Sequence, residues 1–198
     1  LAKMGETCES LNLSKNVLET TSMIYRNLDG HIDVKGKSVV CITAATIYMA
    51  CKQCDVVRSL EEICRGIVPA KDVKSKTKLA ARYYRTMVME MGTLKAPVLT
   101  MDKYISKIAN MTQTEVRVER LALEIAEKTK DNSISDGKSP NGIAAAYLYV
   151  SSVLLGQSVL QRDVSSVAGV TEVTIRNRCK EILTSHKLKI TLRPSLAK

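Results

Sequence analysis

The sequence contains no tryptophan, no phenylalanine and only two histidines in 198 residues. Single-stranded nucleic acid is a poor candidate ligand, because sites for it stack bases on aromatic side chains. His31 and His186 have no nucleophile or carboxylate clustered with them, and the sequence has no GxGxxG motif, P-loop or HExxH motif. We therefore expect that the chain is not an enzyme.

Long apolar runs are also missing. The longest, near 143–150, is interrupted by Ser151 and Ser152 and is shorter than the roughly 18 residues of a membrane span. The N-terminus, LAKMGETCES, lacks the apolar core of a signal peptide. It does not begin with Met, which suggests a piece of a longer protein. We expect no association with a membrane.

Cysteine is present without the spacing of a metal site. Cys51 and Cys54 form the only CxxC motif, whereas a structural zinc ion needs a second pair of ligands. Cys64 with His31 or His186 would complete four ligands, but neither spacing is typical of zinc. We expect no metal or cofactor in these residues. The scattered thiols favour a reducing compartment over a disulfide scaffold.

Positive charge is distributed evenly along the chain. The formal net charge is +10, and residues 1–95 and 96–198 each contain 15 Lys and Arg against 10 Asp and Glu. An excess of this kind in both halves suggests a nucleic acid or an acidic protein as partner. The alternative is a helical scaffold whose charge is incidental, which salt-independent behaviour on heparin would favour.

Apolar periodicity predicts helices along the whole chain, and no stretch alternates as a strand does. Ser38 and the Ser59–Glu62 capping box indicate helix starts, and Gly92 a helix end. The expected helices are 1–11, 15–28, 39–54, 60–66 and 71–92 in the first half; the second half has helices from 102, from 114 to 129, from 140, and two within 161–183.

The two halves repeat one another. Shifted by 101 residues, the segment Gly36–Ser38 coincides with Gly137–Ser139, and Ile42 coincides with Ile143. At the last helix the shift falls to 95, which indicates a six-residue insertion around 69–76 in the first copy. The fold prediction is therefore all-α, with two tandem five-helix bundles over 1–95 and 96–198.

The segment Gln161–Leu183 has the pattern of a helix-turn-helix. A short helix carries Val164 and Val167, Gly169 makes the turn, and a second helix with basic residues opens at Thr171. The second helix of this motif can lie in the DNA major groove.

Three motifs, GKSVVCITAATIYMAC, GKSPNGIAAAYLYVSS and QRDVSSVAGVTEVTIRNRCKEI, closely resemble the core of the transcription initiation factor B family, archaeal factor B and eukaryotic factor IIB. The resemblance covers nearly the whole chain, and the second-half motifs look more archaeal. It implies two cyclin-like repeats, the second ending in the helix-turn-helix.

The resemblance also implies function and partners. The core of this family binds the complex of TATA-binding protein with promoter DNA and reads the B recognition element upstream of the TATA box, which orients assembly with RNA polymerase. A zinc ribbon that recruits the polymerase is expected only N-terminal to such a core. The implied state is a monomer, located in the cytoplasm at the nucleoid if archaeal and in the nucleus if eukaryotic.

The first turns of the second helix, within the helix-turn-helix, supply the expected base-reading residues. Arg176 can bond two atoms of guanine and Val173 can pack on a thymine methyl group, and the two share a helix face. The opposite view is that Val173 belongs to the core and Arg176 to a solvated surface. The full predicted set is Val173, Thr174, Arg176 and Asn177.

Phosphate contacts are expected from both repeats. In the basic helix of the first repeat, four cations at positions i, i+4, i+8 and i+11 form one stripe. The pair Ala80-Ala81 stands where the second repeat has Ile175-Arg176 and departs from the Ile-Gly-Arg usual in the family, so base reading should be weaker there. The predicted phosphate-binding residues are Thr171, Arg178, Lys180, Lys74, Lys78, Arg82 and Arg85.

Two other functions share this fold or motif. A cyclin-type kinase regulator has the same two repeats but no need for a basic helix-turn-helix at 169–178. A regulator with a helix-turn-helix could instead bind DNA without TATA-binding protein, or the chain could be a related initiation factor for another polymerase.

Overall fold

The computed structural model describes residues 2–28, 36–91, 99–130 and 137–185. These residues form α-helices joined by short turns, and no strand occurs among them. The first bundle consists of α1 (Ala2–Ser10), α2 (Lys15–Leu28), α3 (Val39–Gln53), α4 (Leu60–Arg65), the 3-10 turn η1 (Ala70–Asp72) and α5 (Val73–Glu90). The second consists of α6 (Met101–Met111), α7 (Val116–Lys128), α8 (Pro140–Leu154), α9 (Gln161–Ala168) and α10 (Glu172–Ser185).

The repeat seen in the sequence is a repeat of structure. Adding 101 to the bounds of α3 gives 140 and 154, the bounds of α8. Adding 95 to the last residue of α5 gives 185, the last residue of α10. The all-α fold of two five-helix, cyclin-like repeats is thus confirmed, with a helix-turn-helix at the end of the second.

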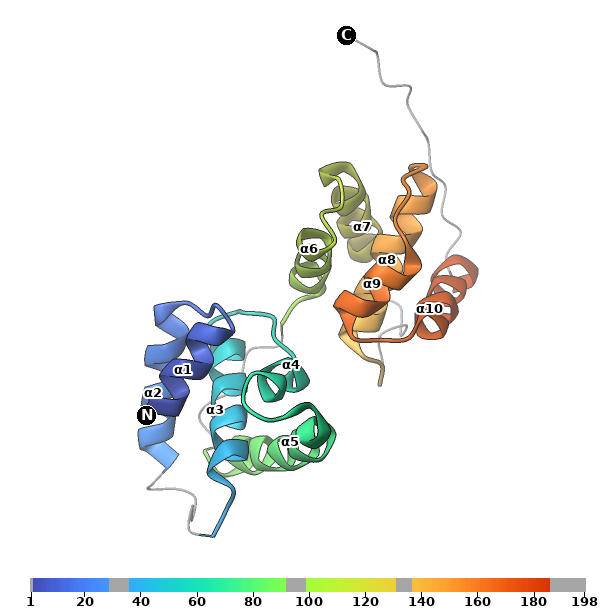
Figure 1. The fold of residues 1–198 in the computed structure, drawn as a ribbon. Coiled ribbons are helices and arrows are strands. Elements are labelled where there is room, and N and C mark those ends of the chain that lie inside the picture. Colours follow the sequence, from blue (N-terminus) through green and yellow to red (C-terminus); the bar gives the residue numbers. More distant parts are fainter. Residues whose placement is uncertain (1, 29–35, 92–98, 131–136, 186–198) are drawn as a thin grey trace. The chain divides into compact units, whose positions relative to one another are not determined.

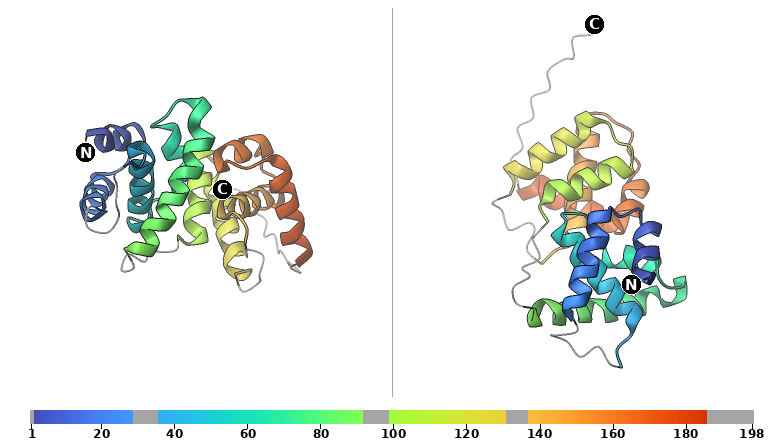
Figure 2. Two further views of the ribbon diagram at one scale, coloured as in Figure 1. Left: turned by 90° about the horizontal axis from the view of Figure 1, so that it is seen from below. Right: turned by 90° about the vertical axis from the view of Figure 1, so that its left-hand side faces the viewer.

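The first bundle is built around α3. Ten of its fifteen side chains are buried, against four of fourteen on α2, so α3 is covered on all sides whereas α2 buries one face. Ala44, Ala45 and Ala50 are almost fully buried, and their small side chains let α1, α2, α4 and α5 approach. Figures 1 and 2 show α2 and α5 on opposite sides of α3.

The second bundle repeats this arrangement around α8. Ten of its fifteen residues are buried, and α6, α7, α9 and α10 all contact it (Figure 1). One polar pair lies inside the bundle: the hydroxyls of Thr129 and Tyr147 are 2.6 Å apart, so the buried Tyr147 oxygen has a partner. Pro140 stands in the first turn of α8, where its missing N–H costs no helical hydrogen bond.

The helix caps predicted from the sequence are confirmed only in part. The Ser59–Glu62 capping box is present, with both reciprocal hydrogen bonds at 3.1 Å. Ser38 precedes α3 as predicted, but its side chain makes no cap hydrogen bond. Instead the Ser38 N–H donates to the Tyr83 hydroxyl at 3.4 Å. The predicted end at Gly92 lies outside the described residues.

The insertion in the first copy becomes helix. It forms η1 and an extra first turn on α5, which has 18 residues where α10 has 14. Two compact units, Leu1–Leu99 and Thr100–Lys198, make up the chain. The boundary predicted between residues 95 and 96 lies outside the described residues. Within those residues, no helix has the length and apolar character to cross a membrane.

Candidate nucleic-acid interface

The turn between α9 and α10 depends on a glycine. Gly169 has φ of +66°, in the left-handed region that side chains with a Cβ adopt only with strain. Its N–H bonds the carbonyl of Ser166, and the N–H of Val170 bonds that of Ser165. These bonds close the end of α9 and direct the chain into the second helix of the motif.

Thr171 caps α10. Its hydroxyl oxygen accepts the N–H of Thr174 at 3.2 Å and lies 2.9 Å from the Thr174 hydroxyl. The first turn of the helix is therefore fixed by a side chain predicted to bind phosphate. Thr171 is exposed, so the cap leaves its surface open to solvent.

The inner face of α10 packs on α8. Ile175 and Ile182 are completely buried, and the thiol of the half-buried Cys179 faces the Ala146 carbonyl at 3.8 Å. Gly142 of α8 lies beside the Thr174 methyl group, which a Cβ placed on this glycine would meet at 3.4 Å, an ordinary van der Waals contact. Helix α10 is thus held near both of its ends on the bundle core.

The outer face carries the predicted base-reading residues. Val173 is 54% exposed, Arg176 and Asn177 are exposed, and Thr174 is half-buried at the edge of the face. Val173 is therefore not a core residue, although its side chain is apolar. Among the described residues no ion pair is formed by Arg176. The structure holds these side chains on one exposed surface, whose contact with bases remains a prediction.

Arg178 has a partner within the chain. Its Nη1 donates to both carboxylate oxygens of Glu181, at 2.6 and 2.7 Å, and Lys138 Nζ donates to Oε2 at 3.1 Å. The hydrogen bonds from Arg178 and then Lys138 lower the pKa of Glu181 below its usual range. Arg178 is half-buried and thus less available to phosphate than the exposed Lys180.

The basic helix of the first bundle exposes its predicted stripe. Val73, Ala80 and Met87 are its buried side chains, spaced by seven residues. The four cations of the predicted stripe lie off that face, and all are exposed; they are Lys74, Lys78, Arg82 and Arg85. No carboxylate of the described residues pairs with them. Their charges are available to a polyanion.

Sequence reasoning missed two residues that position α10. Lys138 and Glu181 form a charge cluster with Arg178. The i, i+3 spacing of Arg178 and Glu181 was a usable signal for one pair. Lys138 is 43 residues from Glu181, so only the tertiary structure joins them.

A family model described as "Transcription factor TFIIB repeat" matches residues 1–83 and 94–185. The chain belongs to the TFIIB family. The two matches correspond to the two bundles, and membership in this family of transcription factors confirms that the chain is not an enzyme.

Named relatives agree with the family match. "Transcription initiation factor IIB" of Archaeoglobus fulgidus is 37% identical over 97% of this chain and 57% of the relative. The proteins of that name from Saccharolobus shibatae and Pyrodictium occultum are also 37% identical, over 91% and 93% of this chain and 56% of each relative. The chain thus spans a little over half the length of these TFIIB relatives, all of which are archaeal.

A chain in the crystal structure of the yeast RNA polymerase II CTD kinase complex CTDK-1 is 16% identical to this chain, with a TM-score of 0.42. The match covers 92% of this chain and 62% of the yeast complex's chain. This likeness is too distant to bear on function.

Proposed function

We propose that the chain is the promoter-binding core of a general transcription initiation factor. It binds the complex of TATA-binding protein with double-stranded promoter DNA, and α10 reads the B recognition element upstream of the TATA box. The observation that carries this proposal is the exposed face of α10, with Val173 and Arg176 outward while Ile175 and Ile182 anchor the helix. Family membership supports the wider role in initiation.

Base reading rests on the chemistry of that face. An arginine can donate two hydrogen bonds to the O6 and N7 of guanine, and a valine can contact the methyl group of thymine. Arg176 and Val173 are i, i+3 neighbours at the N-terminal end of the recognition helix, which is the part that contacts base edges in this motif. Asn177 adds a group able to bond adenine, and Thr174 lies at the rim.

Phosphate contacts fix the register of the helix without selecting a sequence. The exposed Lys180 and Thr171 fit this role on α10. Arg178 fits it less well, because its guanidinium already pairs with the Glu181 carboxylate. On α5, the unpaired stripe is suited to a sugar-phosphate backbone because four cations follow one line of the helix. Contacts with TATA-binding protein and RNA polymerase are also part of the proposal, and family membership is what supports them.

The proposed assembly state is a monomer with no cofactor in these residues. Among the described residues no three His, Cys, Asp or Glu side chains are grouped as metal ligands would be. A zinc ribbon and polymerase recruitment are proposed for residues preceding this core in the full-length protein. With archaeal relatives, the proposed location is the cytoplasm, at the nucleoid.

A gel shift with the purified chain tests the function. The probe is a duplex with a TATA box and randomised upstream bases, with and without TATA-binding protein. A slower complex that needs TATA-binding protein, and selection of one upstream sequence from the random pool, are expected. Tight binding without TATA-binding protein would instead identify a stand-alone regulator. No binding in either condition would favour a kinase regulator or a scaffold.

A further inference from the structure

Two neighbouring stripes of side chains run along α10, and each follows the i, i+4, i+7 spacing of one helix face. The exposed stripe consists of Val173, Asn177 and Lys180. The second stripe begins one residue later and is half-buried; it consists of Thr174, Arg178 and Glu181. The second stripe is therefore a flank of α10, next to the face proposed to read bases.

Charge ties this flank to the segment that precedes α8. The two carboxylate oxygens of Glu181 accept hydrogen bonds from Arg178 Nη1 at 2.6 and 2.7 Å, and Oε2 also accepts one from Lys138 Nζ at 3.1 Å. An arginine Nη1 carries two protons, so the bonds to Glu181 use both. Two cations thus share one carboxylate, which leaves the cluster with a formal charge of +1 instead of +2.

A DNA backbone would pass along this flank if α10 lies in a major groove. A helix with its side chains is about 10–12 Å across and the groove is about 12 Å wide, so the flanks of the helix face the phosphates of the groove walls. The side chains of Lys138 and Arg178 are 27% and 24% exposed. Solvent therefore reaches both cations, although both are already bonded to a carboxylate.

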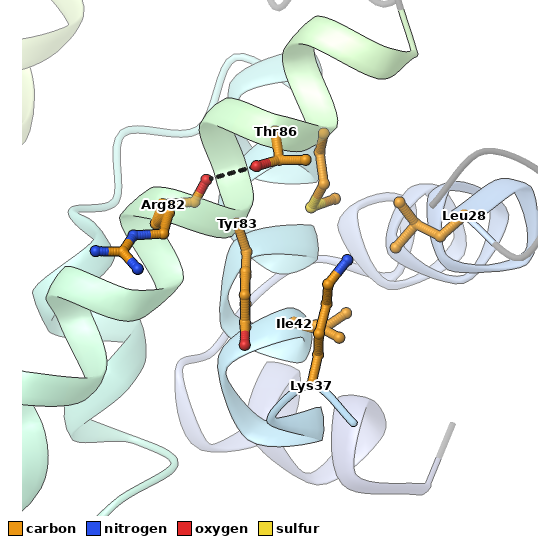
Figure 3. A pocket seen from close by; sticks show the side chains of 7 residues that line it. Leu28, Lys37, Ile42, Arg82, Tyr83 and Thr86 are labelled. Atoms are coloured by element: carbon orange, nitrogen blue, oxygen red, sulfur yellow. Dashed lines mark hydrogen bonds between the residues drawn. The ribbon is translucent and has the colours of Figure 1, made fainter. Parts of the chain in front are cut away.

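The position in α5 that corresponds to Glu181 is neutral. With the shift of 95 residues it is Thr86, whose hydroxyl donates to the Arg82 carbonyl of its own helix at 3.3 Å (Figure 3). The exposed Arg82 guanidinium is directed away from Thr86. At this position, a carboxylate thus stands in the helix proposed to read bases and a hydroxyl in the helix proposed to bind only phosphate.

We infer that Glu181 is an internal competitor of DNA phosphate, which withholds Arg178 and Lys138 from the backbone and so lowers the affinity of α10 for DNA of any sequence. The inference rests on the proposed function, from which it takes the place of α10 in the major groove. A phosphate at the flank must displace the carboxylate before it gains either cation. Base contacts come from the neighbouring stripe and are unaffected. Weak intrinsic binding makes the promoter complex depend on TATA-binding protein.

The opposite role for Glu181 would be to position the two cations for a phosphate. Helix α10 is already anchored by apolar side chains, because Ile175 and Ile182 are completely buried. A carboxylate on the flank also repels a phosphate that approaches it. The charges therefore favour competition, and positioning is an outcome that the test distinguishes.

The test is the salt dependence of binding to a short fluorescein-labelled non-promoter duplex, measured by fluorescence polarisation with the whole 198-residue chain. TATA-binding protein is left out, so this test and the promoter gel shift can fail separately. Each added phosphate contact steepens the slope of log affinity against log salt by about 0.9. We expect the isosteric Glu181→Gln to bind more tightly and to steepen the slope by about one to two, because it frees both cations.

Matched variants isolate the flank. Glu124→Gln removes a carboxylate that pairs with Lys128 on α7, which gives the same change in net charge, and it should leave the slope unchanged. Lys180→Gln removes an exposed cation of α10 and should flatten the slope by about one. Arg178→Gln should flatten it much less in the wild type, but by about one in the Glu181→Gln background, where the guanidinium is free.

Circular dichroism melts show whether each variant is folded. If Glu181→Gln is not, the comparison of Arg178→Gln with Lys180→Gln decides, because loss of a withheld cation changes the slope less than loss of a free one. An equal change in these two variants would contradict the inference.

Three results with folded Glu181→Gln would overturn the inference. The first is an affinity and a slope equal to those of the wild type, which includes no binding by either protein. The second is equal steepening in Glu124→Gln, which would indicate net charge alone. The third is a flatter slope in Glu181→Gln, which would make Glu181 a positioning residue for a pair of phosphate-binding cations.

Discussion

Helices α5 and α10 occupy the same place in the two repeats and pack on equivalent Ala-rich helices, yet their outer faces differ. Among its 18 residues α5 has five basic side chains and one acidic one, whereas α10 has three and two among its 14. The outer face of α10 adds the exposed Val173, and α5 has a lysine, Lys78, at that position. Packing constrains the buried positions and leaves the exposed ones free to differ, which suits the proposed phosphate-binding role of α5 and the proposed base-reading role of α10.

Removing the α5 stripe should have the largest effect. Each phosphate contact contributes about 0.9 to the slope of log affinity against log salt, so four neutralised cations should lower the slope by about three to four. Affinity should fall equally for all upstream sequences. The variant carries glutamine at Lys74, Lys78, Arg82 and Arg85, and gel shifts at several salt concentrations measure the slope.

A control separates position from total charge. Four exposed cations that form ion pairs elsewhere are replaced by glutamine, which gives the same change in net charge. They are Lys15, Arg65, Arg117 and Lys128. If this control lowers the slope as much as the stripe variant does, α5 has no specific role and the contrast with α10 disappears.

Arg176→Ala should have the next largest effect, confined to the second repeat. Loss of a bidentate contact to guanine costs about 1–3 kcal/mol of binding free energy and relaxes the preference at one base. Lys180→Ala, on the same helix, should weaken binding without changing the preference. Selection from a randomised upstream duplex measures both. Unchanged affinity and unchanged preference for Arg176→Ala would remove it from the base-reading set.

Gly169→Ala tests the turn that presents α10. A Cβ at this position meets open space, so the cost is backbone strain alone, about 1–2 kcal/mol of the free energy of unfolding. The control is Gly5→Ala in α1, also in open space but without a positive φ, which should stabilise by up to about 1 kcal/mol. Chemical denaturation measures both. Equal effects would mean that the left-handed turn is not required.

Acid sensitivity of the Glu181 cluster should be the smallest effect. Arg178 and Lys138 lower the pKa of Glu181 in the folded chain, so the pairing is complete above the unfolded value, about 4.3, and is lost as the pH falls through the lower folded value. The Glu181 side chain is 37% exposed, so solvent screens part of the pairing. Melting temperatures are measured for the wild type and for Glu181→Gln from neutral to acidic pH. The two values should converge as the pH falls; a constant difference between the two proteins would contradict the pairing.

Most of the fold could be predicted from the sequence because the internal repeat relates positions about 100 residues apart. The repeat of Gly36–Ser38 at Gly137–Ser139 predicted two bundles, which neither helix propensity nor composition could do. Local signals gave mixed results: the Ser59–Glu62 box formed, whereas the Ser38 side chain makes no cap bond. In that case a tertiary partner, Tyr83, binds the Ser38 backbone N–H.

The exposed side chains of the candidate site could be predicted from the sequence where their spacing follows the period of a helix. The stripe of Ile175, Cys179 and Ile182 placed Val173 and Arg176 on the outside, as the structure has them. The proximity of Gly142 to Thr174 could not be read from spacing, because it depends on how α10 packs on α8. The same holds for Lys138 and Glu181, which only the fold brings together.

Burial of the cysteines has a practical consequence for solution chemistry. None of the six thiols is exposed, and burial raises the pKa of Cys51 to about 12 and that of Cys179 to about 11. At neutral pH these two thiols hold almost no thiolate, the form that alkylating reagents attack. A cysteine introduced at the exposed position of Val173 would therefore react faster with a maleimide dye than either of these two. With the partly buried Cys54 also replaced by serine, such a variant would let a dye on α10 report by fluorescence on DNA binding.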